Sequence, residues 1–313
     1  MRDTCQQSDM HFRTPNFEAF IAPARPGAAI WRLLLGILLI VVIYFAGMFG
    51  LGAAIALSDP ANADRAIFAL MEGNTRFALS MILLSFLVII FGVFLATVLL
   101  HRRNPLTLFG PMRPMIRHFL IALAVFFALQ AVIYGAWAYF YDGTVQRPLS
   151  SVLAFLPIAA VLVLIQTGAE EILFRGYLMQ QLGARFQSWI IWFALPPVAF
   201  GLLHYNPDMM GDLTWYAIIA ITLTGILWTD LTRRTGNIGA AWGWHFANNF
   251  MLMNFLGNAG ELNGFVWMTT PYEVSELPPS LFLIDMCIAI GTWAILRRLL
   301  RKDCNSAATD IFA

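Results

Sequence analysis

Long apolar runs separated by short polar segments dominate the pattern along the chain. A helix needs about 20 apolar residues to cross the ~30 Å hydrocarbon core of a bilayer. The pattern predicts helical spans at about 33–57, 77–100, 118–140, 158–182, 188–205, 212–231, 237–256 and 280–299. The first run is too long for the apolar region of a signal peptide, so we interpret it as an uncleaved span. We therefore expect an all-α, polytopic transmembrane helical bundle of about eight spans.

The fourth apolar run, 149–183, is longer than one span requires. As a straight helix it would be ~50 Å long, which exceeds the thickness of the hydrocarbon core. Two interpretations remain open. Either the helix tilts and kinks at Pro157, or its first half is a separate element and the span covers about 158–182.

The polar segments divide the chain into four parts. These are an N-terminal cytoplasmic tail (1–28), the first three spans (29–144), a membrane core that carries the polar motifs described below (145–256), and an external loop with the last span and a cytoplasmic tail (257–313). If both termini are cytoplasmic, 16 of the 19 Lys and Arg residues lie on the cytoplasmic side. Such a bias is typical of multi-pass membrane proteins and favours an even number of spans.

Composition supports a membrane protein and limits the classes of partner that we expect for it. Hydrophobic residues make up 59% of the chain, charged residues 12%, and the mean hydropathy is +0.71. These values exclude an ordinary soluble domain. The bilayer is the expected environment, and no nucleic-acid partner is expected, because the chain has no run of like charges. The three cysteines show no disulfide-framework or zinc-binding spacing, and the 10 Trp and 26 Phe are interpreted as lipid-facing bulk.

Candidate chemistry comes from polar groups within three apolar spans. Ionisable side chains are costly inside a bilayer and usually mark functional sites there. The motifs are Glu-Glu-x-x-x-Arg, Phe-x-x-x-His and His-x-x-x-Asn, and their residues are Glu170, Glu171, Arg175, Phe200, His204, His245 and Asn249. At a rise of ~1.5 Å per residue, Glu170, His204, His245 and Asn249 lie about 14 to 24 Å above the cytoplasmic surface. The sequence therefore predicts one site built from three helices.

The spacing within the first motif separates the two glutamates. Glu171 and Arg175 are four residues apart on a helix and can form an ion pair, whereas Glu170 lies about 100° around the helix and is free for another partner. A carboxylate and an imidazole can hold and deprotonate a water molecule. A second imidazole with a carboxamide can donate hydrogen bonds to an oxyanion. This set suits hydrolysis of an amide bond at or within the membrane.

A metal site is the rival interpretation of the same atoms. Glu170, His204 and His245 form a two-histidine, one-carboxylate set that resembles the ligands of hydrolytic zinc. The chain contains no His-Glu-x-x-His segment, however, and a carboxamide such as Asn249 is a poor zinc ligand. We favour a metal-free mechanism with no cofactor, and zinc stays as the alternative.

Together, in this order, the three motifs resemble those of the CAAX-prenyl-protease and bacteriocin-processing family of intramembrane endopeptidases. The resemblance covers about residues 145–256. It implies that Glu170 is the general base and activates water with His204, while His245 and Asn249 stabilise the oxyanion. Glu171, Arg175 and Phe200 would support them. The family has been described both as metalloproteases and as glutamate-dependent proteases, so the resemblance leaves the question of a metal open.

The resemblance also implies the class of substrate. We expect a membrane-associated protein or peptide, of the prenylated CAAX type or bacteriocin-like. Arginine nearly replaces lysine in the chain, which hints at a high-GC bacterium and hence at the inner membrane. Two other functions remain open: a non-catalytic scaffold or bacteriocin-immunity protein that retains the fold, and a cation or proton carrier. The absence of any internal repeat speaks against the carrier.

Overall fold

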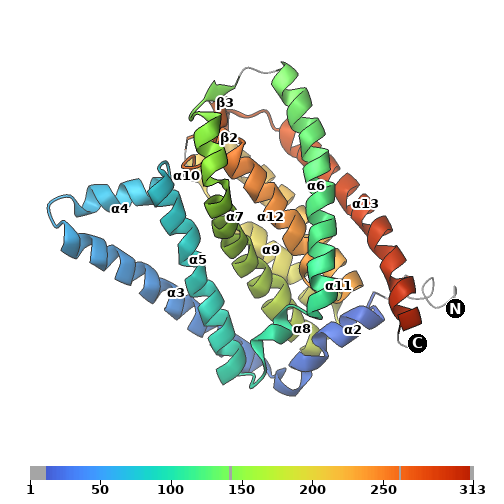
Figure 1. Cartoon of the computed structure of the whole chain (residues 1–313). Coiled ribbons are helices and arrows are strands. Elements are labelled where there is room, and N and C mark those ends of the chain that lie inside the picture. Colours follow the sequence, from blue (N-terminus) through green and yellow to red (C-terminus); the bar gives the residue numbers. More distant parts are fainter. Residues whose placement is uncertain (1–11, 141–142, 261, 311–313) are drawn as a thin grey trace.

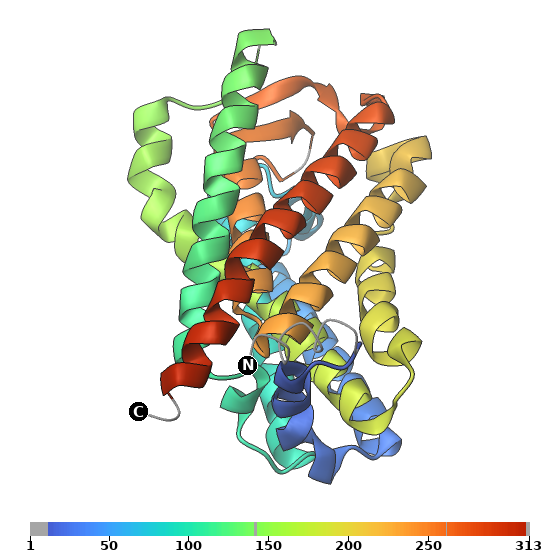
Figure 2. The same cartoon turned by 90° about the vertical axis from the view of Figure 1, so that its right-hand side faces the viewer.

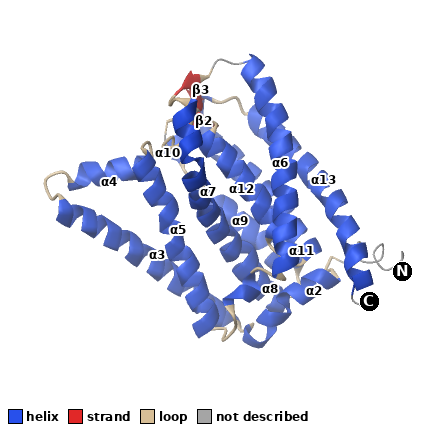
Figure 3. Ribbon diagram, viewed as in Figure 1, coloured by secondary structure: helices blue, strands red, loops and turns tan. Residues whose placement is uncertain are grey.

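The structure, a computed structural model, describes residues 12–140, 143–260 and 262–310, and helices predominate in these ranges (Figures 1 and 3). The longer helices are α3 (Ile30–Ser58), α5 (Arg76–Leu99), α6 (Met112–Phe140), α7 (Leu149–Glu171), α11 (Thr214–Thr235), α12 (Gly239–Asn254) and α13 (Ser280–Asp310). The shorter α-helices are α2 (Pro15–Ile21), α4 (Ala63–Glu72), α8 (Gln180–Arg185), α9 (Leu195–Leu202) and α10 (Pro207–Met210). Two π-helical segments are η3 (Ile172–Met179) and η4 (Ile190–Ala194), and the 3₁₀ segments are η1 (Ala22–Gly27), η2 (Pro105–Leu108), η5 (Gly211–Leu213) and η6 (Val274–Glu276). The predicted helical character is confirmed.

Six helical stretches in the described part of the chain are long and apolar enough to cross a membrane. They are Ile30–Ser58, Arg76–Leu99, Met112–Gly135, Leu149–Arg185, Pro207–Thr235 and Ser280–Leu300. Each overlaps one of the spans expected from the sequence. α2 and the C-terminal end of α13 lie at the same end of the bundle (Figures 1 and 2), as an even number of crossings requires. The cytoplasmic assignment of that end stays a prediction.

The predicted count of eight spans is not confirmed, because two of the expected spans are short helices. The segment expected at 188–205 forms the apolar helix Ile190–Leu202, and the segment expected at 237–256 forms α12, which has 16 residues. α12 contacts α6 and α7 and is buried along most of its length. Its apolar side chains therefore meet protein as well as lipid, and a helix enclosed in this way need not match the bilayer thickness. Hydropathy alone does not distinguish a helix that spans the bilayer from a short helix enclosed by protein.

The long fourth run is one continuous helical stretch. α7, η3 and α8 follow one another without a break from Leu149 to Arg185, and Pro157 lies within α7. The interpretation as a single long helix is therefore confirmed over the separate-element alternative. The π-helical segment η3 begins directly after Glu171 and contains Arg175. A π-helical stretch inside an α-helix often marks a functional position.

Residues 12–27 belong to the segment expected as a cytoplasmic tail, and they are folded against the bundle; residues 1–11 of that segment lie outside the described residues. Thr14 caps α2, and Phe17 and Ile21 on α2 are fully buried. Arg13 donates to the backbone carbonyls of Gly183 and Phe186. Apolar side chains four residues apart on a capped helix were the signal for this docking.

Close backbone approach places α12 at the centre of the bundle, between α6 and α7 (Figure 1). A Cβ atom at Gly239 would lie 2.0 Å from the Met115 carbonyl oxygen, and one at Gly243 would lie 2.2 Å from that of Phe119. Only glycine fits at either position, and small residues spaced four apart commonly bring membrane helices together. This contact fixes the height and rotation of the helix that carries the third motif.

A small sheet covers the end of the bundle opposite α2 (Figure 1). It contains β1 (Thr144–Val145), β2 (Leu256–Ala259) and β3 (Met268–Glu273), in the order β1-β3-β2. β1 pairs antiparallel with β3, with Thr144 opposite Thr269, and β2 pairs parallel with β3. The part expected as an external loop, at the start of 257–313, therefore includes strands. Their pairing joins segments far apart in sequence, which local patterns do not reveal.

Candidate active site

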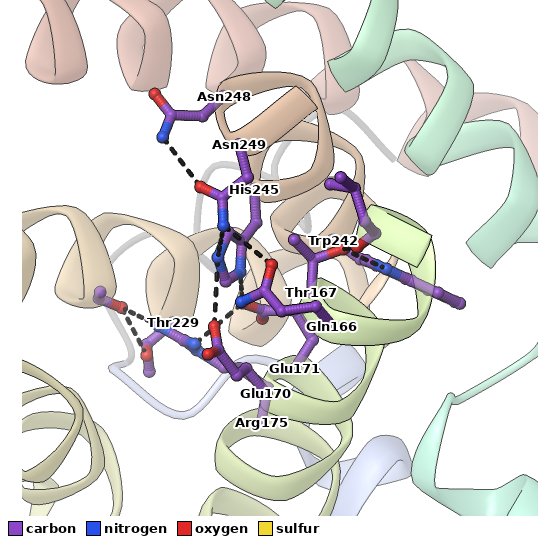
Figure 4. Close-up of polar contacts among 12 residues, drawn as sticks. Gln166, Thr167, Glu170, Glu171, Arg175, Thr229, Trp242, His245, Asn248 and Asn249 are labelled. Carbon is purple, nitrogen blue, oxygen red and sulfur yellow. Dashed lines mark hydrogen bonds and ion pairs between the residues drawn. The ribbon is translucent and has the colours of Figure 1, made fainter. Parts of the chain in front are cut away.

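The polar groups of the first and third motifs meet where the end of α7 passes α12 (Figure 4). Glu170 and Glu171 are the last two residues of α7, and Arg175 follows one turn later in η3. His245 and Asn249 lie one turn apart on α12. The predicted convergence of these two motifs is therefore present in the structure.

Glu171 is the buried anchor of the cluster. Its side chain is 0% exposed, and its Oε1 accepts a hydrogen bond of 2.9 Å from Arg175 Nη1. The same oxygen lies 2.9 Å from His245 Nδ1. An ionised carboxylate only accepts hydrogen bonds, so Nδ1 of His245 must carry a hydrogen and donate it. Glu171 thereby fixes the imidazole and leaves Nε2 to face the rest of the site.

Glu170 faces Nε2 of the same imidazole. Its Oε2 lies 3.3 Å from His245 Nε2, and its side chain is 15% exposed. Its sequence neighbour Glu171 is fully enclosed, so Glu170 is the more accessible of the two acids. A burial difference between adjacent carboxylates separates their roles, because only the accessible group can meet water or a substrate.

The formal charges of the cluster do not balance without a bound proton. The cluster holds two carboxylates, Glu170 and Glu171, and one permanent cation, Arg175, which is 1% exposed. An uncompensated charge in a low-dielectric interior is costly. Glu170 Oε2 and His245 Nε2 are 3.3 Å apart without a hydrogen bond between them. One proton on either Glu170 or His245 would make the four groups neutral. The pair can therefore move a proton without changing the net charge of the site.

Asn249 lies beside the same face of His245. Its Nδ2 lies 3.4 Å from His245 Nε2 and donates to Gln166 Oε1 at 2.9 Å. Its Oδ1 accepts from Asn248 Nδ2 at 3.1 Å. Gln166 was not among the residues singled out from the sequence. It lies one turn before Glu170 on α7, and that spacing was the available signal.

The second motif adjoins the cluster through an aromatic ring. His204 follows the end of α9, and its Nδ1 donates to the backbone carbonyl of Phe200 at 2.8 Å. The Phe200 ring lies 4.8 Å from that of His204 and 6.0 Å from that of His245, between centroids. None of the contacts described for His204 reaches Glu170. α9 ends two residues before His204, whose backbone N–H donates to the Gly201 carbonyl.

Trp228 on α11 covers one face of the His245 ring, and it is not among the residues singled out from the sequence. Its indole stacks on the His245 imidazole, with centroids 4.4 Å apart and 24° between the planes. The Arg175 guanidinium carbon lies 5.2 Å from the ring centroids of both Trp228 and Phe200. Trp228 is 4% exposed, so the expectation that the Trp residues are lipid-facing is wrong for this one. Trp228 lies three residues from the end of the expected span 212–231, where Trp residues are common in membrane proteins, so its position in the sequence did not indicate its burial.

The residues present do not form a metal cage. Among the described residues, no group of three His, Cys, Asp or Glu side chains is placed to hold a metal ion. The proposed ligand set Glu170, His204 and His245 is therefore not gathered around one point in this structure.

Comparison with known proteins connects this site to a family. Residues 151–251, which include all three motifs, match the family model described as Type II CAAX prenyl endopeptidase Rce1-like. The resemblance to the CAAX prenyl endopeptidases is confirmed. The chain is also similar to the uncharacterized protein YyaK of Bacillus subtilis (strain 168), with 29% identity over 259 residues that cover 79% of this chain and 84% of that protein. No solved structure matches the chain.

The family match and the six apolar helices together indicate a multi-pass integral membrane protein. The matched family model is one of CAAX-type proteases. The matched stretch begins in α7 and ends in α12, the two helices that meet at the cluster. The family-model match and the polar cluster therefore concern the same part of the molecule.

Proposed function

We propose that this protein is an intramembrane endopeptidase that hydrolyses a peptide bond of a membrane-associated substrate, with Glu170 as the general base. The observation that carries the proposal is the contact of the accessible Glu170 carboxylate with an imidazole that a second, buried carboxylate fixes. Such a pair can accept a proton from water and hold it close to the reacting atoms. The family match gives the reaction class.

The reactive form has the bound proton on His245 and a free Glu170 carboxylate. Glu170 takes a proton from water, and the hydroxide adds to the scissile carbonyl. Nε2–H of His245 and an Nδ2–H of Asn249 then donate to the oxyanion. As the tetrahedral intermediate breaks down, Glu170 gives its proton to the leaving amine. We assign His204 to the water site as well, because its Nδ1 donates to a carbonyl and its Nε2 remains an acceptor.

The substrate class we propose is a prenylated CAAX-type or bacteriocin-like peptide, cleaved at the membrane. The test is cleavage of a fluorogenic farnesylated CAAX peptide by the purified protein in detergent, beside the same peptide without the lipid. Glu170→Gln keeps the shape of the side chain and removes the base, so kcat should fall by about 10²- to 10⁴-fold. Glu72→Gln makes the same chemical change on α4 and should leave kcat unchanged.

The outcomes separate the candidate functions. Cleavage by the parent protein that is lost in Glu170→Gln and kept with a metal chelator supports a glutamate-dependent protease. Loss in the chelator arm as well would move the zinc alternative ahead. A parent protein that cleaves neither these peptides nor a bacteriocin precursor would favour the non-catalytic scaffold or immunity protein.

A further inference from the structure

A chain of three carboxamides runs from the site to the interior of the α7–α12 contact (Figure 4). Asn248 donates to Asn249, and Asn249 donates to Gln166. Gln166 is 6% exposed and lies outside all three sequence motifs. The protein keeps a buried amide here, where an apolar side chain would avoid the cost of removing a polar group from water.

Hydrogen-bond directions fix which way the Asn249 amide points. Glu171 can only accept, so His245 donates through Nδ1 and presents Nε2 as an acceptor when the imidazole is neutral. Asn249 therefore turns its NH₂ group toward His245. The second hydrogen of that NH₂ group goes to Gln166 Oε1. Nε2 of His245 and Oε1 of Gln166 together hold the Asn249 amide with its N–H donors facing the site.

Formation of the reactive state removes one of these two acceptors. When His245 takes the bound proton, Nε2 becomes a donor and no longer accepts from Asn249. The amide would then gain a charge-assisted hydrogen bond by turning its Oδ1 toward the imidazolium. In that orientation Asn249 no longer donates a hydrogen bond to an oxyanion. Its Oδ1 also accepts the Nε2–H of His245, so that this donor is no longer available to the oxyanion. A second acceptor that does not titrate is needed to prevent this rotation.

We propose that Gln166 is a positioning residue, whose Oε1 keeps the Asn249 amide turned with its donors toward the substrate. The inference rests on the proposed function, because it assigns Asn249 to the oxyanion site. Gln166 does not touch the reacting atoms and acts through Asn249 alone. Asn248, which is half-buried and donates to Oδ1 from the other side, gives weaker support because it is more exposed.

The variants separate this role from a general effect on packing. Gln166→Met has nearly the same shape and removes the acceptor. Gln181→Met is the matched control. Gln181 continues the same helical stretch in α8, is 2% exposed, and its side-chain atoms have no hydrogen-bond partner. Its replacement should leave the kinetics unchanged.

The kinetic test compares backgrounds with and without Asn249. Gln166→Met should lower kcat by about 10- to 100-fold with KM within twofold, because only the transition state loses an interaction. In an Asn249→Ala background, Gln166→Met should cause no further loss. An equal loss in both backgrounds, or a rise in KM alone, would overturn the proposal.

If the parent protein cleaves none of the peptides tried, a stability measurement still tests whether Gln166 acts through Asn249. Thermal unfolding of Gln166→Met, Asn249→Ala and the double variant tests whether the two side chains are coupled. The drop in Tm of the double variant should be smaller than the sum of the single drops by about 2 °C or more. Additive drops in Tm would show that the two amides are independent and would overturn the inference. The proposed function is tested separately, by whether the parent protein cleaves a substrate and Glu170→Gln does not.

Discussion

Glu170 and Glu171 are neighbours in sequence with opposite surroundings. Glu171 is enclosed and bonded to Arg175 and His245, whereas Glu170 is the acid that water can reach. The sequence predicted this division, because the four-residue spacing pairs Glu171 with Arg175 and leaves Glu170 free. It did not predict that one imidazole joins both acids. The contact of His245 with both glutamates depends on the rotation of α12 about its axis, which its packing against α6 determines.

Removal of the anchoring carboxylate should destabilise the fold as well as the site. Glu171→Gln leaves Arg175 buried without its partner, and breaking a buried pair in this way typically lowers the free energy of unfolding by about 3–5 kcal/mol. The double variant Glu171→Gln/Arg175→Met removes both charges and should recover most of the stability, but not the activity. Thermal unfolding in detergent checks both. A single variant as stable as the parent would contradict the buried ion pair.

Trp228 should matter through its contact with His245. Trp228→Leu removes the stacked ring and the aromatic face beside Arg175, and kcat should fall about 3- to 10-fold, as expected for one aromatic contact. Trp228→Phe should keep more than half of the activity. Trp215→Leu is the control, because Trp215 lies on the same helix and is 59% exposed. Equal effects at both positions would show that the stacked ring has no special role.

At the scale of elements, apolar periodicity predicted where helices occur and misjudged what surrounds them. The runs at 188–205 and 237–256 have the composition of membrane spans, yet they form short helices. Enclosure of α12 depends on Gly239 and Gly243, whose missing side chains admit the backbone of α6. The glycines were visible in the sequence, but their partner was not, because α6 lies more than a hundred residues earlier.

Gly243→Ala should separate α12 from α6 and disturb the site together with the fold. Its Cβ would lie 2.2 Å from the Phe119 carbonyl oxygen, so the helices must move apart. Overpacking of this kind typically costs about 1–3 kcal/mol. Gly50→Ala is the control, because nothing lies within 4 Å of a Cβ there. Thermal unfolding should show a lower Tm for Gly243→Ala and an unchanged or higher Tm for Gly50→Ala.

At the scale of the whole molecule, His101 joins three segments at the end of the bundle that carries α2. Its Nδ1 lies 3.0 Å from the Gly27 carbonyl oxygen, and its Nε2 lies 2.8 Å from the Tyr177 hydroxyl. A carbonyl only accepts, so Nδ1 carries the hydrogen and Nε2 accepts from Tyr177. Burial, reinforced by Arg103 and Arg32, lowers the pKa of His101 below its ordinary value of 6.5, although the hydrogen bond to Gly27 opposes this.

Stability should therefore fall on acidification. A lowered pKa in the folded state means that the unfolded chain binds the proton more tightly, so the stabilisation is complete above pH 6.5 and is lost as the pH falls below it. One proton contributes a slope of at most about 1.4 kcal/mol per pH unit. Tm measured from pH 8 to pH 5 checks this, with His101→Gln as the comparison. The same acid slope in both proteins would contradict the assignment.

The N-terminal contacts have a consequence for the order of assembly. Thr14 donates to the carbonyl of Arg233, which is 219 residues later in the chain, and Asn16 donates to that of Arg234. At a synthesis rate of 5–20 residues per second, the ribosome makes the second partner roughly 10 to 40 s after the first. The N-terminal segment can contact Gly183, Phe186 and Trp192 earlier, but its docking cannot be complete until α11 has been made. Its last contacts therefore form late in synthesis, when only α12 and the segments that follow it remain to be added.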